Sequence, residues 1–416
     1  MTTTYTYSSE GLKEITIHTL ETSNSRRRYV VSRNGQHFEV SEPVVDLIVS
    51  LQECISIEDA VERFSKKRGR SYTSEEFVIL MQTCISPLFV PKAKGSKRTK
   101  AFLFRKDLLS ENVISHCSEP LKGLFHFGVI LPVLLLVAVL EVMFFTGTTM
   151  DFFIDDMTAP ILMGLVVLFL FSSMFHELGH AAACKFFRVD HGPIGFAIYL
   201  IFPVFYTDIS NVWTLSRKKR TVINFAGVYF QLIFLIPLLV IYLLTDSELL
   251  KYCIVIINFN FIFTLNPFFK FDGYWVMSDL LGVPNLRGRS RELFAYLFSS
   301  PGKRRQMKRP FLLTMRQTEK IFFVIYSVIV NLFFIYYFVY VIPHFIGSFI
   351  DTFPAKAREV ILSLSFGKMP DFGTLRAVFV QLLFMGLCAY LIFNLGLALV
   401  KSFKRKKTTC ESSQDN

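Results

Sequence analysis

The sequence predicts an α-helical membrane protein with several spans and a small soluble α+β domain near its N-terminus. Hydrophobic residues make up 52% of its 416 residues, phenylalanine alone occupies 46 positions, and only 19% of the residues are charged. The apolar residues occur in blocks long enough to cross a bilayer as helices, which takes about 20 residues. This composition argues against an ordinary soluble protein.

The net charge of +12 follows from where the basic residues lie. They gather beside the apolar blocks, at Arg217–Arg220, between Arg287 and Lys320, and at Lys404–Lys407. Basic residues that flank membrane spans are retained on the cytoplasmic side. We therefore expect a multi-pass protein of the cell membrane with both termini in the cytoplasm, and no nucleic-acid partner.

The N-terminal part before the spans divides into two segments. Residues 1–25 are polar, and we expect them to be flexible. Residues 26–92 have the pattern of a small domain, because Asn34-Gly35 separates two short β-prone runs and Asn-Gly is a strong hairpin signal. Three short helices follow, and the residues expected at their N-terminal ends are Ser41, Ser56 and Ser74.

Six apolar stretches predict six spans, at about 123–146, 159–186, 221–244, 249–266, 321–343 and 374–400. The chain then divides into a flexible N-terminus (1–25), a soluble domain (26–92), a basic connector (93–122), an intramembrane core (123–292), a basic cytoplasmic loop (293–320), C-terminal spans (321–400) and a cytoplasmic tail (401–416). Residues 192–213 fit neither a span nor a plain loop, since Pro203 interrupts an apolar run. We expect a hairpin there that dips into the membrane, with its backbone groups satisfied by protein or by a water-filled cavity.

The second span ends in His176-Glu177-Leu178-Gly179-His180, a His-Glu-x-x-His pattern. Residues four apart on a helix share a face, so both imidazoles can bind one zinc ion. The carboxylate of Glu177 can then act as general base on a zinc-activated water. Ionisable residues within an apolar span are costly, which favours a functional site over histidines that are merely buried between helices.

Asp272 is the predicted third ligand, because a catalytic zinc site has three protein ligands and an open position. The fourth span returns the chain to the depth of His180, and Pro267 and Gly273 allow it to turn the carboxylate towards the metal. Alternatively, Asp272 only caps the next helix or pairs with Lys270. We expect one Zn²⁺ per chain.

These motifs resemble those of the site-two protease family of intramembrane metalloproteases. The family has His-Glu-x-x-His on one span and an Asn/Pro-rich segment ending in Asp-Gly on a later span. The resemblance implies that His176, His180 and Asp272 are the metal ligands and that Glu177 is catalytic. Ala226-Gly227 resembles the family's Ala-Gly-Pro-x-x-Asn element, with Val228 and Gln231 in place of the proline and the asparagine.

Two further residues near Asp272 are candidates for a supporting role. Asn266 could hydrogen-bond the substrate backbone or the developing oxyanion, where a buried donor lowers the barrier. Lys270 could do the same, or pair with Asp272 or Asp279.

A narrower resemblance is to the peptide zinc metalloproteases of bacterial peptide maturation and export. It is carried by Phe202–Asp208, Asn266–Tyr274 and Ser278–Leu286, and covers about Phe171 to Arg291. It implies a bacterial protein whose substrate is a ribosomally made precursor peptide. A peptide-modifying enzyme or an exporter would be a further partner, and membrane lipid would surround the spans.

Residues 26–92 resemble a PqqD-like peptide-recognition domain, a small winged-helix fold, through His37–Pro43 and Ser56–Val61. In such domains the bound peptide adds as an edge strand, and backbone hydrogen bonds supply the affinity. A DNA-binding winged helix and a purely structural cap are the alternatives.

The sequence thus predicts a membrane-embedded zinc endopeptidase that cleaves a leader-bearing or modified ribosomal peptide. One alternative is an intramembrane protease of a membrane-anchored regulator such as an anti-sigma factor. Another is a non-catalytic component of peptide export or immunity.

Overall fold

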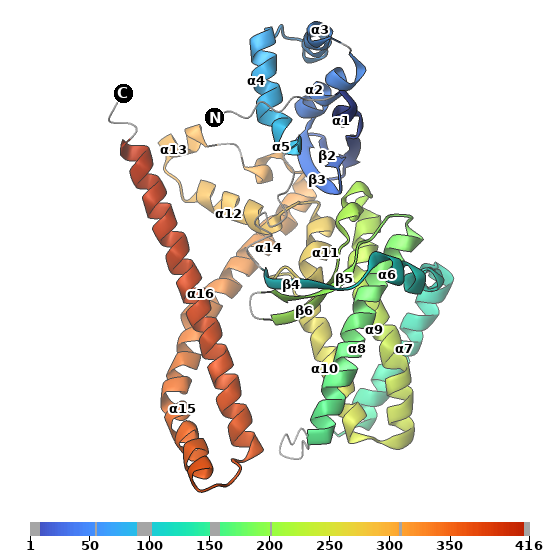
Figure 1. The fold of residues 1–416 in the computed structure, drawn as a ribbon, viewed down its shortest axis with the longest axis vertical. Helices are drawn as coiled ribbons and strands as arrows, with labels where there is room; N and C mark the ends of the chain where they lie inside the picture. Colours follow the sequence, from blue (N-terminus) through green and yellow to red (C-terminus); the bar gives the residue numbers. More distant parts are fainter. Residues whose placement is uncertain are drawn as a thin grey trace. The chain divides into compact units, whose positions relative to one another are not determined.

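The computed structural model describes residues 9–54, 56–89, 102–149, 159–199, 202–307 and 310–411 (Figure 1). Residues 93–101 of the predicted connector and residues 412–416 of the predicted tail lie outside this part. The chain divides into two compact units, one of residues 1–152 and 157–324 and the other of residues 153–156 and 325–416.

The first unit begins with a small α+β domain. Its antiparallel sheet has the order β1-β2-β3, with β1 at Thr16–Leu20, β2 at Arg28–Arg33 and β3 at Gln36–Ser41. The helices are α1 (Ser9–Lys13), α2 (Glu42–Glu53), α3 (Ile57–Arg68), α4 (Ser74–Cys84) and α5 (Ser86–Phe89). Buried apolar residues such as Val31, Ile48 and Phe77 form its core.

The predicted helix starts in this domain are confirmed. Ser41 precedes α2, the side chain of Ser56 accepts a hydrogen bond from the Asp59 amide, and α4 begins at Ser74 behind a capping box of Thr73 and Glu76. The predicted flexibility of residues 1–25 is wrong for residues 9–20, which form α1 and β1. They are ordered because their apolar side chains, among them Leu12 and Ile15, are buried in the domain core, and no local pattern shows this.

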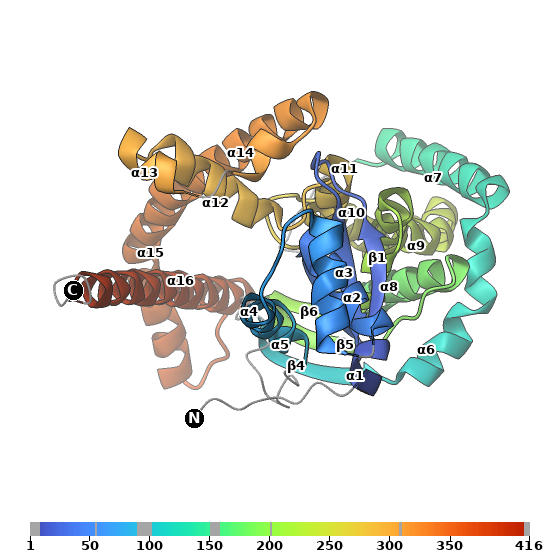
Figure 2. The same ribbon diagram turned by 90° about the horizontal axis from the view of Figure 1, so that it is seen from above.

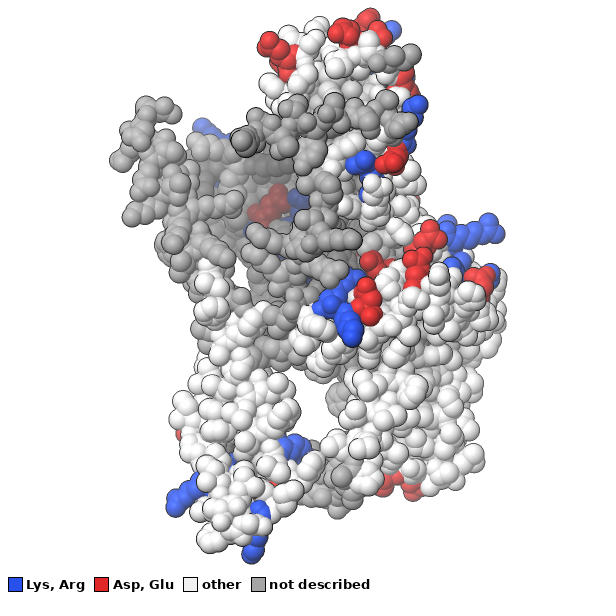
Figure 3. All heavy atoms as spheres, in the orientation of Figure 1, with Lys and Arg blue, Asp and Glu red and all other residues white. Residues whose placement is uncertain are grey.

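The described residues contain five helices long and apolar enough to cross a membrane, so this is a polytopic helical membrane protein. The first three are α7 (Phe127–Gly147), α8 (Ala159–Phe186) and α9 (Arg217–Thr245). In Figure 3 the face formed by this bundle is almost free of charged side chains. The predicted fourth span is α10 (Glu248–Thr264), whose 17 residues extend only about 26 Å. α10 is shorter than those five helices because Pro267, just beyond its end, cannot continue a helix.

α9 is the central helix of this bundle. It contacts α7, α8, α10 and the short helix α11 (Asp272–Leu281), and Figure 2 shows these helices around it. Gly179 permits the close approach of α8, because a Cβ atom there would lie 2.5 Å from the carbonyl oxygen of Ala226. After α11 come α12 (Leu286–Leu297), α13 (Pro301–Gln306) and the 3₁₀ turn η4 (Phe311–Thr314).

A second antiparallel sheet has the order β4-β5-β6. The hairpin predicted within residues 192–213 is formed by β5 (Ile194–Tyr199) and β6 (Phe202–Thr207), with Phe196 paired to Phe205. The third strand, β4 (Phe102–Leu109), comes from the segment predicted as a connector, which also contains α6 (Glu111–Ser118) and the 3₁₀ turn η1 (Pro120–Phe125). The prediction of a basic connector is therefore wrong for residues 102–125, which form a strand, a helix and a 3₁₀ turn. The strand forms because it pairs with β5, which is remote in the sequence. A 3₁₀ turn, η3 (Ser210–Thr214), follows β6.

The C-terminal helices are α14 (Gln317–Tyr336), the π-helical segment η5 (Tyr337–Val341), α15 (Ile342–Ser365) and α16 (Phe372–Glu411). α14, η5 and α15 form one helical stretch of 49 residues, far longer than the span predicted at 321–343. In the second unit α15 and α16 lie side by side. The rings of Phe345 and Phe384 have centroids 3.8 Å apart, and Gln381 donates a hydrogen bond to Thr352 over 2.7 Å.

Candidate metal centre

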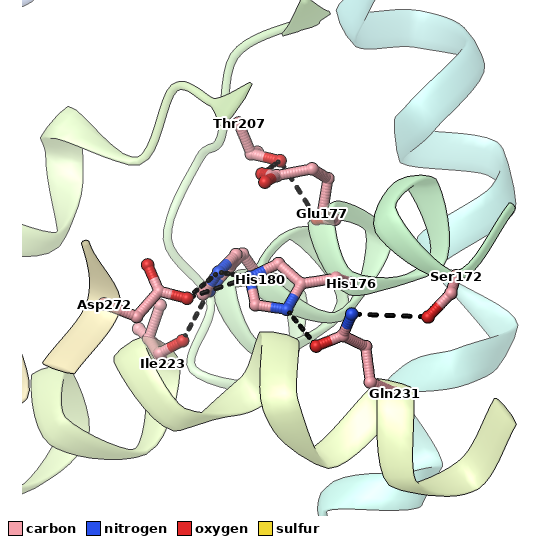
Figure 4. A network of polar contacts seen from close by, with 8 residues as sticks. All are labelled: Ser172, His176, Glu177, His180, Thr207, Ile223, Gln231 and Asp272. Carbon is pink, nitrogen blue, oxygen red and sulfur yellow. Dashed lines mark hydrogen bonds and ion pairs between the residues drawn. The ribbon is translucent and has the colours of Figure 1, made fainter. Parts of the chain in front are cut away.

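Two imidazoles from α8 and one carboxylate from α11 meet in the bundle (Figure 4). Nε2 of His176 lies 2.8 Å from Oδ2 of Asp272, and Nε2 of His180 lies 3.2 Å from the same oxygen. The two Nε2 atoms are 3.2 Å apart. Both histidines are buried, and the Asp272 side chain is 23% exposed.

The far nitrogen of each imidazole faces an oxygen. Nδ1 of His180 lies 2.7 Å from the carbonyl oxygen of Ile223, which can only accept a hydrogen bond, so this Nδ1 is the donor. Nδ1 of His176 lies 3.1 Å from Oε1 of Gln231, and the amide nitrogen of Gln231 donates to Ser172 over 3.3 Å. A neutral imidazole that donates from Nδ1 has a lone pair on Nε2.

This donor set fits a zinc ion. Two Nε2 lone pairs and a carboxylate oxygen converge within hydrogen-bond distance of one another, an arrangement that a shared cation stabilises. Two histidines and one carboxylate are a usual set for catalytic zinc. Ligands of a tetrahedral zinc ion at about 2.05 Å are roughly 3.3 Å apart, close to the separations here.

Glu177 lies next to His176 on α8 and is also buried. Its Oε2 accepts a hydrogen bond of 2.8 Å from the hydroxyl of Thr207, the last residue of β6. Figure 4 shows the carboxylate turned towards Thr207, on the other side of the imidazoles from Gln231. The hairpin thus holds one oxygen of the predicted general base.

Two glycines make room for this centre. A Cβ atom at Gly227 on α9 would lie 2.3 Å from Nε2 of His176, so a larger residue would displace the imidazole. A Cβ atom at Gly273 would lie 2.0 Å from the carbonyl oxygen of Leu265. The expectation that Gly273 permits a tight backbone beside Asp272 agrees with this geometry.

The other two sequence candidates make contacts of their own. Oδ1 of Asn266 accepts a hydrogen bond of 2.8 Å from the amide of Phe268, which closes a local turn after α10. Nζ of Lys270 lies 5.9 Å from the ring centroid of Tyr274, and its described contacts do not include Asp272 or Asp279. The structure therefore brings together His176, His180 and Asp272 but leaves Asn266 and Lys270 outside this contact network.

Sequence reasoning missed the residues that orient the imidazoles and Glu177. Gln231 carried a signal, because it is a polar residue within an apolar span. Thr207 lies within Phe202–Asp208, a stretch that carries the resemblance, but that resemblance assigned it no role. The carbonyl of Ile223 carried no signal. The positions of both groups depend on how α9 and the hairpin pack on α8.

Comparisons with known proteins give one partial similarity. The chain is 26% identical over 121 residues, or 29% of its length, to a protein of Bacillus subtilis (strain 168) named "Putative peptide zinc metalloprotease protein YydH". The match spans 48% of that relative, about half its length. No family model matches the chain. No solved structure matches it either.

Proposed function

We propose that this protein is a membrane-embedded zinc endopeptidase whose metal is held by His176, His180 and Asp272. The observation that carries this proposal is the convergence of two imidazole Nε2 atoms and one carboxylate oxygen beside Glu177. The similarity to a relative named as a peptide zinc metalloprotease supports the same chemistry.

Peptide hydrolysis assigns a distinct task to each residue. When bound, zinc supplies a Lewis acid that lowers the pKa of water and polarises a carbonyl group. Glu177 accepts a proton from the attacking water and returns it to the amide nitrogen, so a C–O bond forms as the C–N bond breaks. The hydroxyl of Thr207 holds one oxygen of Glu177 and thereby orients the other.

The hairpin is also suited to hold an extended substrate. Among the described strands β6 pairs only with β5, so it lies at an edge of the β4-β5-β6 sheet, and it ends at Thr207. An extended peptide that pairs with such an edge gains main-chain hydrogen bonds with little demand on its sequence. A peptide paired with β6 would run towards Glu177.

We assign as substrate a ribosomally made peptide, with the N-terminal domain as its recognition module. The contact between this domain and the core supports the assignment: Nε2 of His37 on β3 lies 3.1 Å from Oδ1 of Asn211 in η3. Asn211 comes only four residues after Thr207. A leader held by the domain would therefore bring the following residues to the hairpin.

The test combines metal content with cleavage by the full-length chain in lipid nanodiscs. The probes are a fluorescent peptide library and any short peptide encoded beside the gene, and cleavage is read by mass spectrometry. We expect one zinc per chain, and Glu177→Gln should retain the zinc but lose at least about a hundredfold in rate. Absence of zinc, or equal cleavage by Glu177→Gln, would refute the proposal. Cleavage restricted to a substrate with its own transmembrane helix would refute the substrate assignment alone.

A further inference from the structure

A line of polar groups runs along one face of α9, opposite the ligands of α8 and α11. The polar groups are Arg220, the carbonyl of Ile223, Asn224 and Gln231, and Gly227 lies on the same face. These positions are three, four, seven and eleven residues after Arg220, so they share a helix face. Two of them hold the imidazoles and a third makes room for one. Arg220 and Asn224 are not used by the proposed reaction.

Arg220 and Asn224 both bind Asp279, which lies on α11 seven residues after Asp272. Nε of Arg220 donates to Oδ1 of Asp279 over 2.7 Å, and Nδ2 of Asn224 donates to Oδ2 over 2.9 Å. The exposed fractions of Arg220, Asn224 and Asp279 are 3%, 7% and 5%. The guanidinium of Arg220 also lies over the ring of Trp213, 5.3 Å from its centroid.

Arg217 strengthens the attachment at the C-terminal end of α11. Its Nε donates to the carbonyl of Asp279 over 2.8 Å, and Nη2 donates to the carbonyl of Leu280 over 2.5 Å. The carbonyl of Asp279 also accepts a hydrogen bond of 3.1 Å from the amide of Gly282, which caps the helix. A cation at this end of α11 is favoured by the helix dipole. The helix then ends at Gly282 with a φ of 62°.

We propose that Arg220, Asn224 and Asp279 form a clamp between α9 and α11 that positions the carboxylate of Asp272 at the two imidazoles. The inference rests on the proposed metal function. Asp272 and Asp279 are two turns apart on one helix of ten residues, so fixing Asp279 fixes the end that carries Asp272. α9 thereby orients all three metal ligands, through Gln231, through Ile223, and through the α9–α11 clamp.

A purely stabilising role explains the clamp less well. A buried ion pair has a desolvation cost that can exceed its Coulombic gain, and apolar residues of similar volume are often as stable or more stable. The clamp instead fixes the orientation of α11, because two donors from α9 bind both oxygens of the Asp279 carboxylate. A metal ligand on a short helix needs this, since small displacements weaken metal binding.

The test replaces the whole ion pair, so that no lone buried charge remains. The variant Arg220→Met/Asp279→Leu keeps apolar volume at both positions. The measurements are zinc affinity, by competition with a chromophoric chelator, and the visible spectrum of cobalt(II) bound in place of zinc. We expect zinc affinity to fall by at least about tenfold and the cobalt(II) spectrum to change, because the carboxylate is displaced.

Two further variants keep the inference falsifiable if the double variant fails to fold. Asn224→Ala retains the ion pair, and we expect a smaller loss of affinity, about threefold. Arg220→Lys retains the charge and should recover part of the affinity. The matched control is Asp46→Asn in the N-terminal domain, which removes a buried carboxylate paired with Lys67 and Arg68, and should leave zinc affinity unchanged.

The outcomes separate the clamp from the proposed function. If the wild-type chain binds no zinc, the proposed function fails and the clamp with it. If the wild-type chain binds zinc and the folded clamp variants bind it equally well with the same cobalt(II) spectrum, the clamp is refuted and the metal site stands. An equal loss of affinity in Asp46→Asn would also refute the clamp, because the effect would then be one of general stability.

Discussion

At the scale of single residues, the centre depends on close contacts as much as on its ligands. His176 reaches Asp272 only because Gly227 leaves space beside its ring. His180 and His176 each have an oxygen behind Nδ1, which fixes the side of the ring that faces the centre. These contacts are predicted to be as sensitive to substitution as the ligands themselves.

Gly227→Ala tests the space beside His176. The new methyl group would lie 2.3 Å from Nε2, so the imidazole must move and zinc affinity should fall by at least about tenfold. Zinc content and chelator competition measure this. Gly128→Ala on α7 is the control, because a Cβ atom there has no neighbour within 4 Å. Unchanged affinity in Gly227→Ala would contradict the close packing of α9 on His176.

Thr207→Val tests the orientation of Glu177. Valine has the shape of threonine without its hydroxyl, so the carboxylate loses the 2.8 Å hydrogen bond while the ligands are untouched. We expect kcat to fall by about tenfold with one zinc retained, and Thr207→Ser to restore most of the rate. Loss of zinc in Thr207→Val would show that Thr207 acts on the metal site as a whole and not on Glu177.

At the scale of elements, two sets of packing contacts determine the geometry of the site. The first is α9 against α8 and α11, which brings the polar line of α9 to the three ligands. The second is the β4-β5-β6 sheet, which carries Thr207 to Glu177. Because the sheet lies outside the ligand set, the two packings can be perturbed separately.

Ala197→Pro tests the contribution of the sheet. Ala197 is buried in β5, the central strand, and pairs with Arg105 of β4 and Val204 of β6. Proline has no amide hydrogen and fits poorly in a central strand, so the hairpin and Thr207 should shift. We expect the cleavage rate to fall by about tenfold or more while zinc content stays near one per chain. Ala197→Gly keeps the amide hydrogen and is the control. An equal loss of cleavage rate in Ala197→Gly would show that the missing backbone hydrogen bond of β5 is not the cause.

At the scale of the whole molecule, the first unit joins the small α+β domain to the helical bundle. Besides the contact between His37 and Asn211, the segment after β1 makes backbone hydrogen bonds with the rest of the unit. The amide of Ser23 donates to the carbonyl of Gly282 over 2.9 Å, and the carbonyl of Ser23 accepts from the amide of Arg316 over 3.1 Å. The domain is thus attached close to the end of α11. This attachment supports the proposed role of the domain, which is to present a peptide to the core.

His37→Ala tests this coupling. Removing the contact with Asn211 should loosen the domain near η3, so KM for a leader-bearing peptide should rise by about threefold to tenfold while kcat for a short leaderless peptide stays constant. His18→Ala, at an exposed position on β1, is the matched control. Equal loss with both peptides would place His37 in a structural role instead.

The sequence by itself determined the class of the protein and the candidate ligands. Apolar stretches report membrane helices because helix length and hydrophobicity are local properties. His176, Glu177 and His180 are one motif on one helix, and Asp272 followed from its depth relative to them. The start of α2 after Ser41 and the hairpin turn at Asn34-Gly35 were readable for the same reason, since caps and turns depend on neighbouring residues.

Only the tertiary structure decided which groups surround those ligands. The pairing of β4 with β5 joins residues about ninety positions apart, and nothing local in residues 102–109 indicates it. The same holds for Thr207 at Glu177 and for Arg220 at Asp279. Each contact depends on the register and close approach of separate elements, which backbone packing sets through space. Local sequence motifs identify which residues can bind the metal, whereas the orientation of these residues depends on contacts between elements that are remote in the sequence.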